Sequence, residues 1–278
     1  MSLDPDMIRF RRLPELDQLE VLHASYGAHP LPGHSHASFA IGVIEAGGAQ
    51  IQAHGAPATG SSGSLVLLAP DEMHTFQAFE APGWTCRMFY PSTALMRRAL
   101  NELGHSVAHV RFPHPAVPDA ELATAVRRLT HTLLHSPSAL ERESQLVWTL
   151  AQIAARHADT RIALPPATRE PVAVAQVRAY LDAHYADQVT LDTLATVAHL
   201  SSFHLLRVFR DHVGIPPHAY LIQRRVRAAR ALLLDGHPIA EVALAVGFTD
   251  QSHLNQHFRR VIGLPPGQYL KGSKNLQE

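Results

Sequence analysis

The segment HLLRVFRDHVGIPPHAYL, which begins at His204, and the segment HLNQHFRRVIGLPPGQYL, which begins at His253, are two copies of one unit. Nine of the eighteen aligned positions are identical. The match continues upstream, where LDTLATVAHLS (191–201) pairs with IAEVALAVGFT (239–249) at an offset one residue shorter. A unit that recurs in this way is one supersecondary element used twice. The second copy therefore has one extra residue in its turn.

Each copy is predicted to form a helix-turn-helix. Apolar residues from Ile239 to Val246 recur at helical spacing, which is typical of a short amphipathic helix. Gly247 follows, and glycine favours the left-handed conformation that ends helices. Each copy then offers a capping oxygen for its next helix, from Ser201 or Ser202 and from Thr249 or Asp250. This arrangement is typical of a motif whose second helix enters the major groove of DNA.

The segment between the two units supports the same interpretation. Residues 217–234 have an apolar side and would form a linker helix roughly 27 Å long at 1.5 Å per residue. This length is close to the ~34 Å between successive major-groove faces of B-DNA. Residues 201–234 carry one acidic side chain, Asp211, and a stripe of arginines that suits phosphate contacts: Arg207, Arg210, Arg224, Arg225, Arg227 and Arg230. Tandem helical hairpins without a role in DNA binding are the alternative.

The second copy, PIAEVALAVGFTDQSHLNQHFRRVIGLPPGQYL (238–270), resembles the signature of the AraC/XylS family of transcriptional regulators. The resemblance implies a seven-helix DNA-binding domain, a double-stranded DNA partner and contact with RNA polymerase. It places two sets of side chains toward the grooves: Ser202, Phe203, Leu206 and Arg207, and Gln251, Ser252, Asn255 and Gln256. Arginine can pair with guanine, and Gln or Asn with adenine. Arg210 and Arg259 are expected at phosphates, with Arg224 and Arg225 as weaker candidates.

The first part of the chain has the pattern of short strands separated by Gly and Pro. The expected strands are MIRFRR, LEVLHASY, SFAIGVIEAG, AQIQAHG, SLVLLAP, MHTFQAF and TCRMFYP. Residues 45–48 (Glu-Ala-Gly-Gly) are predicted to form a hairpin turn. Many short strands at even spacing favour a barrel or jelly roll. The whole chain is therefore expected to be an α+β protein of two domains, with a β-barrel first and an all-α domain second.

Two segments of the expected barrel, LPGHSHASFAIGVIEAGG and GSLVLLAPDEMHTF, are similar to the two cupin motifs of the sensory domain in many AraC-type regulators. The cupin metal pattern has an HxH pair, a following Glu and a third His. His34, His36 and His74 match, whereas Ile41 occupies the position of the Glu and Glu45 lies further along. A three-histidine metal site is one alternative, because three histidines can hold zinc. The preferred interpretation is a metal-free barrel without a cofactor.

A metal-free barrel would hold a small organic effector in its interior. The candidate contacts alternate along the expected strands as inward-facing residues should, and ordinary core packing is the alternative for each. The effector-binding candidates are His34, His36, Phe39, Ile41, His74, Trp84, Arg87 and Tyr90.

After Pro91 the spacing of apolar residues changes from the two-residue period of strands to the period of helices. We expect a helix over 92–103, a strand over 107–112 and two amphipathic helices over 119–135 and 138–158. The two helices resemble the dimerisation element of the family, which implies a homodimer, and the alternative is that they only cover the barrel. The expected domains are a cupin-like effector-binding domain (1–158), a Pro-rich linker (159–171) and the DNA-binding domain (172–274).

Composition limits the remaining possibilities. Cys86 is the only cysteine in the sequence, which fits a reducing cytoplasm. No apolar run approaches the roughly 20 residues of a membrane span, so we expect a cytoplasmic protein without a membrane partner. The preferred class is a transcriptional regulator that senses a small organic effector, and the alternatives are a metal-responsive regulator and a cupin-type metalloenzyme with an accessory helical domain. The repeat and its arginines favour the regulator, and no nucleophile elbow or phosphate-binding loop favours catalysis.

Overall fold

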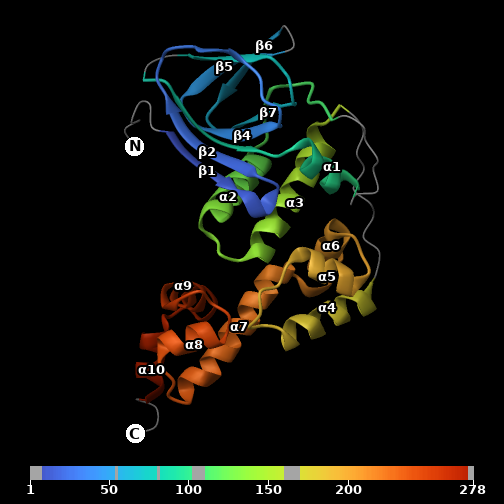
Figure 1. Cartoon of the computed structure of the whole chain (residues 1–278). Coiled ribbons are helices and arrows are strands. Elements are labelled where there is room, and N and C mark those ends of the chain that lie inside the picture. Colours follow the sequence, from blue (N-terminus) through green and yellow to red (C-terminus); the bar gives the residue numbers. More distant parts are fainter. Residues whose placement is uncertain (1–7, 54–55, 80–81, 102–109, 160–169, 275–278) are drawn as a thin grey trace. The chain divides into compact units, whose positions relative to one another are not determined.

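The structure is a computed structural model that describes residues 8–53, 56–79, 82–101, 110–159 and 170–274 (Figure 1). The chain divides into two compact units. The N-terminal unit comprises residues 1–136 and 145–166, and the C-terminal unit comprises residues 137–144 and 167–278. The predicted α+β fold is confirmed, because the first unit is rich in sheet and the second is helical.

The N-terminal unit contains two antiparallel sheets. One sheet has the order β1 (Ile8–Leu13), β2 (Leu19–Tyr26), β9 (Trp84–Tyr90), β4 (Ala40–Ala46), β7 (Ser64–Leu68) and β10 (Ala116–Pro118). The other has the order β3 (Leu31–His34), β8 (His74–Ala78), β5 (Gly48–Ala53) and β6 (Ala56–Ser61). A short 3-10 helix, η1 (Pro14–Leu16), joins β1 to β2.

The two sheets pack face to face around one apolar core. Side chains of alternate residues point to opposite faces of a strand, and in β9 the inward set is Trp84, Cys86 and Met88. Ile51 and Phe76 of the smaller sheet belong to the same buried cluster. Each sheet keeps its own hydrogen-bonded order, so the predicted barrel is a jelly-roll-like sandwich that is not closed.

The predicted hairpin at residues 45–48 is wrong. β4 pairs with β7 and β9 in the larger sheet, whereas β5 pairs with β6 and β8 in the smaller one. The chain therefore crosses from one sheet to the other at Gly47, whose φ is +69°. A Cβ at this position would collide with the carbonyl oxygen of Gly83, so this corner requires glycine.

Helices cover the outer face of the larger sheet. α1 (Thr93–Asn101) follows β9, and α2 (Ala120–His135) packs on β2, β4, β7 and β9. α3 (Ala139–His157) is the second predicted amphipathic helix. The predicted apolar stripes are confirmed as buried: Leu122, Val126, Leu129, Leu133, Leu140, Leu146, Leu150 and Ile153. The predicted strand at 107–112 is absent from its described part, 110–112, and the predicted linker lies almost wholly outside the described residues.

The C-terminal unit has the seven helices that the family resemblance implies, within its described residues. They are α4 (Pro171–Ala183), α5 (Leu191–Ala198), α6 (Ser202–Val213), α7 (Pro217–Leu234), α8 (Ile239–Ala245), α9 (Gln251–Ile262) and α10 (Pro266–Lys274). Figure 1 shows α7 running between the α4–α6 group and the α8–α10 group. Among the described residues, no helix is long and apolar enough to cross a membrane.

Gly42 provides a test of the packing of β4 against its neighbour β9 in the larger sheet. A Cβ at Gly42 would collide with the Met88 sulfur and the Arg87 carbonyl oxygen. Gly42→Ala should lower the free energy of unfolding by about 1–3 kcal/mol, as overpacked cores do. Urea-induced unfolding of the full chain measures this loss. Gly27→Ala is the matched control, because nothing lies within 4 Å of its added Cβ. Equal stability of the two variants would contradict the described packing.

Candidate DNA interface and histidine cluster

The two repeated segments fold into two helix-turn-helix elements, α5 with α6 and α8 with α9. Ser201 caps α6 by accepting from the His204 amide at 3.3 Å, and Asp250 caps α9 by accepting from the His253 amide at 2.8 Å. The preceding turns contain a left-handed residue in each copy, His199 (φ +53°) and Gly247 (φ +87°). The predicted extra residue of the second copy lies between Gly247 and its cap.

The second turn requires glycine for a steric reason. A Cβ at Gly247 would lie 2.6 Å from the Ala186 carbonyl oxygen, so this turn packs directly on the backbone before α5.

The caps of α6 and α9 differ in chemistry, since Ser201 offers a hydroxyl and Asp250 a carboxylate. The backbone amide of His253 is the first of the causes that lower the pKa of Asp250. Asp250 is therefore an anionic cap, which suits the positive end of the α9 dipole.

The C-terminal ends of α6 and α9 also match. Gly214 (φ +82°) and Gly263 (φ +91°) end the two helices, and each donates its amide to the carbonyl four residues earlier. Beyond each turn, a tyrosine ring packs edge-on against a phenylalanine of the preceding helix. The ring centroids are 5.8 Å apart for Phe209 and Tyr220, and 5.6 Å apart for Phe258 and Tyr269. The identical residues of the repeat therefore make equivalent contacts.

α9 has one buried face and one polar face. Leu254, His257 and Phe258 are buried against the rest of the unit. The predicted DNA-reading side chains lie on the other side of this helix: Gln251, Ser252, Gln256 and Arg259 are exposed, and Asn255 is half-buried. Amides, a hydroxyl and a guanidinium on one exposed helix face are the groups that read base edges and contact phosphates.

α6 is arranged differently from α9. Ser202, Phe203 and Leu206 are buried, with 4%, 0% and 3% of their surfaces exposed. Arg210 is exposed, whereas Arg207 is half-buried, and its Nε and Nη2 atoms lack a hydrogen-bond partner among the described residues. Groove contacts by Ser202, Phe203 and Leu206 need these buried side chains to become accessible, so the three assignments stay predictions.

The arginines of α7 divide into two kinds. Arg225 is 4% exposed and donates to the carbonyl oxygens of Tyr185 and Asp187 at 2.6 and 2.8 Å. Burial lowers the pKa of Arg225 to about 10, so it stays charged at neutral pH. Arg224 lies 3.3 Å from Asp182 and over the Tyr185 ring. The prediction that Arg225 contacts phosphate is wrong, because its guanidinium joins α7 to the segment before α5.

The N-terminal unit brings three predicted site residues together. His34, His36 and His74 place one ring nitrogen each within 4.8 Å of the others. β3 and β8 pair at His34 and His74, and their rings are 4.4 Å apart between centroids. The alternation of the HxH pair directs His36 to the same side, 5.2 Å from the His74 ring. The spacing of these histidines in the sequence therefore predicted a real cluster.

Two of the histidines are oriented by backbone carbonyls. Nδ1 of His34 lies 2.8 Å from the Pro32 oxygen, and Nδ1 of His74 lies 2.8 Å from the Glu72 oxygen. A carbonyl can only accept, so both Nδ1 atoms carry the proton and both Nε2 atoms present a lone pair. Burial, and then the neighbouring His74 and His34, lower the pKa of His36 to about 4. Burial is also the main cause of the lowered pKa of His74.

The histidines line a narrow cavity of only about 30 Å³. Trp84 fills the space behind them, stacked between Tyr26 and Phe76 with centroid distances of 5.0 Å to each. Tyr90 packs 5.0 Å from His36. Trp84 and Tyr90 therefore lie where the sequence places them. Tyr26, Phe76 and Cys86 also line the cavity but were not predicted, although each occupies an inward-facing position of its strand.

Three predicted effector contacts lie elsewhere. Ile41 pairs with Phe89 and is on the face of the larger sheet that α2 covers. On that same face, Arg87 lies 3.0 Å from Glu45, and Arg127 of α2 donates to Glu45 at 3.1 Å. Phe39 packs against Phe112. The assignments of Ile41 and Arg87 to the interior are wrong, because strand alternation directs them outward, and Phe39 packs on Phe112 instead of lining the cavity. Glu45 lies on the same outer face and cannot serve as a fourth metal ligand.

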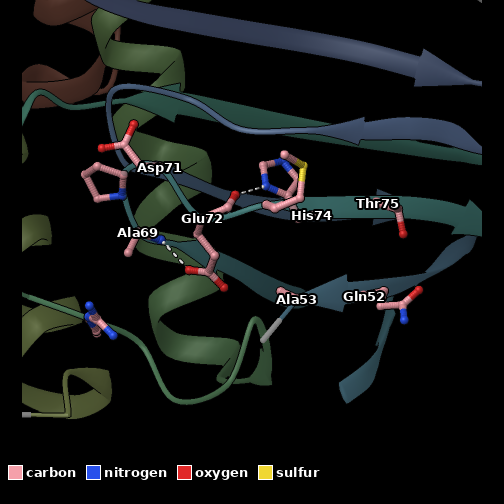
Figure 2. A pocket seen from close by; sticks show the side chains of 10 residues that line it. Gln52, Ala53, Ala69, Asp71, Glu72, His74 and Thr75 are labelled. Atoms are coloured by element: carbon pink, nitrogen blue, oxygen red, sulfur yellow. Dashed lines mark hydrogen bonds between the residues drawn. The ribbon is translucent and has the colours of Figure 1, made fainter. Parts of the chain in front are cut away.

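A larger groove of about 620 Å³ adjoins the cluster, and His74 lines both spaces. Figure 2 shows Gln52, Asp71, Glu72 and Thr75 around it, with the Glu72 carboxylate turned back to accept from the Ala69 amide. Arg111 completes its polar lining. The groove was not predicted, because its walls come from β5, β8 and loops that are distant in the sequence.

Two helix-turn-helix elements in one chain with a β-sandwich that contains a polar groove define a DNA-binding regulator with a separate ligand-binding unit. Residues 18–150 match the AraC-like ligand binding domain, and residues 194–272 match a helix-turn-helix domain family. The chain belongs to the AraC family of transcriptional regulators, which bind DNA. This identification confirms the resemblance in the second repeat and favours the regulator over the metalloenzyme.

Known proteins match along most of the chain. The uncharacterized HTH-type transcriptional regulator YbfI of Bacillus subtilis (strain 168) is 29% identical over 80% of this chain and 81% of its own length. The HTH-type transcriptional activator RhaS of Salmonella heidelberg (strain SL476) is 24% identical over 87% of this chain and 88% of its own. The DNA-binding domain of AdpA, solved with a target DNA, is 34% identical over 37% of this chain and 93% of that one, with a TM-score of 0.35.

The buried Arg225 provides a test of the helical unit. Arg225→Met removes both guanidinium donors and leaves two carbonyl oxygens without them, so we expect a loss of about 1–3 kcal/mol in the free energy of unfolding. Thermal and urea unfolding of the full chain measure this loss. Arg227→Met is the matched control, because Arg227 is exposed on the same helix. If both variants were as stable as the wild type, the structural role of Arg225 would be refuted.

Proposed function

We propose that this regulator binds a specific operator through α9 and α6 in successive major grooves and alters transcription when a small polar organic molecule occupies its N-terminal unit. The observation that carries the proposal is the repeated element, in which equivalent caps, glycine turns and Phe–Tyr contacts present two recognition helices on either side of α7. An 18-residue helix separates the elements by roughly 27 Å, which suits adjacent turns of the duplex.

The groove beside His74 is the proposed effector site. Its volume of about 620 Å³ lies within the range of roughly 300–1,000 Å³ that is typical of small-molecule pockets. Asp71 supplies a carboxylate, and Arg111 supplies a cation. This lining suits a ligand with both an ammonium and a carboxylate, such as an amino-acid-like molecule. The narrow cavity of about 30 Å³ between the histidines is too small for it.

We also propose partners for the protein and a direction for the regulation. The relative RhaS is named a transcriptional activator, and we propose activation with RNA polymerase as a partner. A homodimer joined through the α2–α3 hairpin would bring two such units to one operator. We propose that the protein acts in the cytoplasm and has no catalytic role, since Glu45, a carboxylate near the expected cupin position, is engaged by Arg87 and Arg127.

Regulation requires an effector with different affinities for two arrangements of the protein, one that binds the operator and one that does not. A gel-shift assay with the DNA upstream of the protein's own gene, repeated with a panel of metabolites, tests this requirement. The proposal expects operator binding that survives excess unrelated DNA and that changes with a ligand that also raises the melting temperature. Equal affinity for all DNA sequences, or no response to any stabilising ligand, would refute it.

Separate variants distinguish base reading from phosphate contact on α9. Asn255→Ala should cost about 1–3 kcal/mol at one base pair and relax the sequence preference there, because an amide that pairs with adenine is lost. Arg259→Ala should reduce the slope of log affinity against log salt by about 1 and leave the preference unchanged.

Affinity measurements over a salt series, on the operator and on single-base variants, give both quantities. Arg128→Ala removes the same charge from an exposed position on α2 and should change neither. A uniform loss of affinity in Asn255→Ala would make Asn255 a backbone contact. An unchanged salt slope in Arg259→Ala would remove Arg259 from the interface.

A further inference from the structure

The histidine cluster contains a buried acceptor that the described residues leave unused. His74 is 2% exposed, and its Nε2 atom has no hydrogen-bond partner among the residues that the structure describes. Buried polar side-chain atoms are nearly always paired, and an exception points to a missing water, ion or ligand. One ring nitrogen from each of His34, His36 and His74 lies within 4.8 Å of the other two.

The surroundings of the cluster fix the ring tautomers. The carbonyl oxygens of Pro32 and Glu72 accept from Nδ1 of His34 and His74, each at 2.8 Å. Metal-binding histidines almost always donate their second ring nitrogen to a carbonyl or carboxylate in this way, because the bond orients the ring and makes the free nitrogen a better donor. Figure 2 shows this bond for His74.

The size of the cavity decides what can satisfy these nitrogens. An ordered water needs roughly 10–15 Å³ of such space, so the cavity of about 30 Å³ holds only one or two water-sized species, and a drug-sized organic molecule does not fit between the three rings and the aromatic wall behind them. A single ion does fit. Zinc–nitrogen bonds of about 2.0–2.1 Å at tetrahedral angles place ligand nitrogens roughly 3.4 Å apart. The three ring nitrogens lie within 4.8 Å of one another, so the rings have to close by about 1.4 Å at most to bind zinc.

We propose that His34, His36 and His74 together bind one divalent transition-metal ion of the zinc class, with one coordination position open. Imidazole nitrogen suits zinc, copper, iron and nickel, and three histidines with a vacant fourth position are sufficient for zinc. Because His74 also lines the larger groove, the ion would lie beside a molecule bound there. The inference rests on the proposed function only in treating the ion as part of the sensory unit.

Metal titration of the full-length chain tests the site. Protein dialysed against EDTA is titrated with Zn²⁺ by calorimetry and with Co²⁺ by visible spectroscopy, in which tetrahedral coordination gives distinctive bands. We expect one ion per chain. His36→Ala and His74→Gln should each weaken binding by at least about 100-fold, since even the loss of an orienting partner costs 10–100-fold.

His29→Ala is the matched control, because His29 is exposed, lies close in sequence and is outside the cluster. It should bind metal as the wild type does. His36 is only half-buried, so His36→Ala decides the question if His74→Gln does not fold. Absence of saturable binding in the wild type, or binding that His36→Ala leaves unchanged, would overturn the proposal.

Operator affinity measured on the same samples separates this proposal from the proposed function. Operator binding without metal binding would remove the metal site and leave the DNA-binding account intact. Metal binding at these histidines without operator binding would retain the site and refute the proposed function. The variants should bind the operator as metal-free wild type does, because their substitutions lie outside the helix-turn-helix elements.

Discussion

Each recognition helix is held by an aromatic contact across a glycine and proline turn, Phe209 with Tyr220 and Phe258 with Tyr269. The glycine ends the helix in a left-handed conformation, and Pro216 or Pro265 starts the next helix at a fixed angle. The buried phenylalanine rings leave only the opposite face of each helix for the proposed DNA contacts. The orientation of both reading faces therefore depends on the same small set of repeated residues.

A different constraint organises the N-terminal unit. Alternation along β4 and β9 sends Trp84 into the sandwich and sends Ile41, Arg87 and Glu45 to the face under α2. The pairing of β3 with β8 brings His34 and His74 together. The interior is filled by aromatic rings, so its polar groups converge at one end, where the histidines adjoin the groove. The two kinds of ligand that the unit could bind, a metal ion and an organic molecule, thus have neighbouring but separate spaces.

The sequence predicted the features that depend on local residues. The caps at Ser201 and Asp250 and the turn at Gly247 follow from neighbouring residues, and repetition made the second half of the chain easy to interpret. The histidine cluster was predictable because its spacing is distinctive. The inward assignments of Ile41 and Arg87 failed because a strand pattern gives alternation but not which face is interior. The hairpin at residues 45–48 failed because only tertiary packing determines which sheet β5 joins.

The burial of side chains in α6 and α7 could not be predicted from the sequence either. Arg225 has the same side chain as its exposed neighbours, and only the carbonyl oxygens of Tyr185 and Asp187 give it a structural role. Phe203 and Leu206 are apolar, so their burial agrees with their chemistry, whereas their expected place in a groove came from the family resemblance. Ile41 stands where a cupin glutamate is expected, and the engaged Glu45 does not replace it.

The central claim is that one chain reads two successive major grooves with α6 and α9. Methylation interference on the operator tests it most directly, because guanine N7 lies in the major groove. The account predicts two clusters of interfering guanines, about 10 base pairs apart on one face of the duplex, with the cluster assigned to α9 weakened in Gln251→Ala. A single cluster, or interference confined to minor-groove positions, would contradict it.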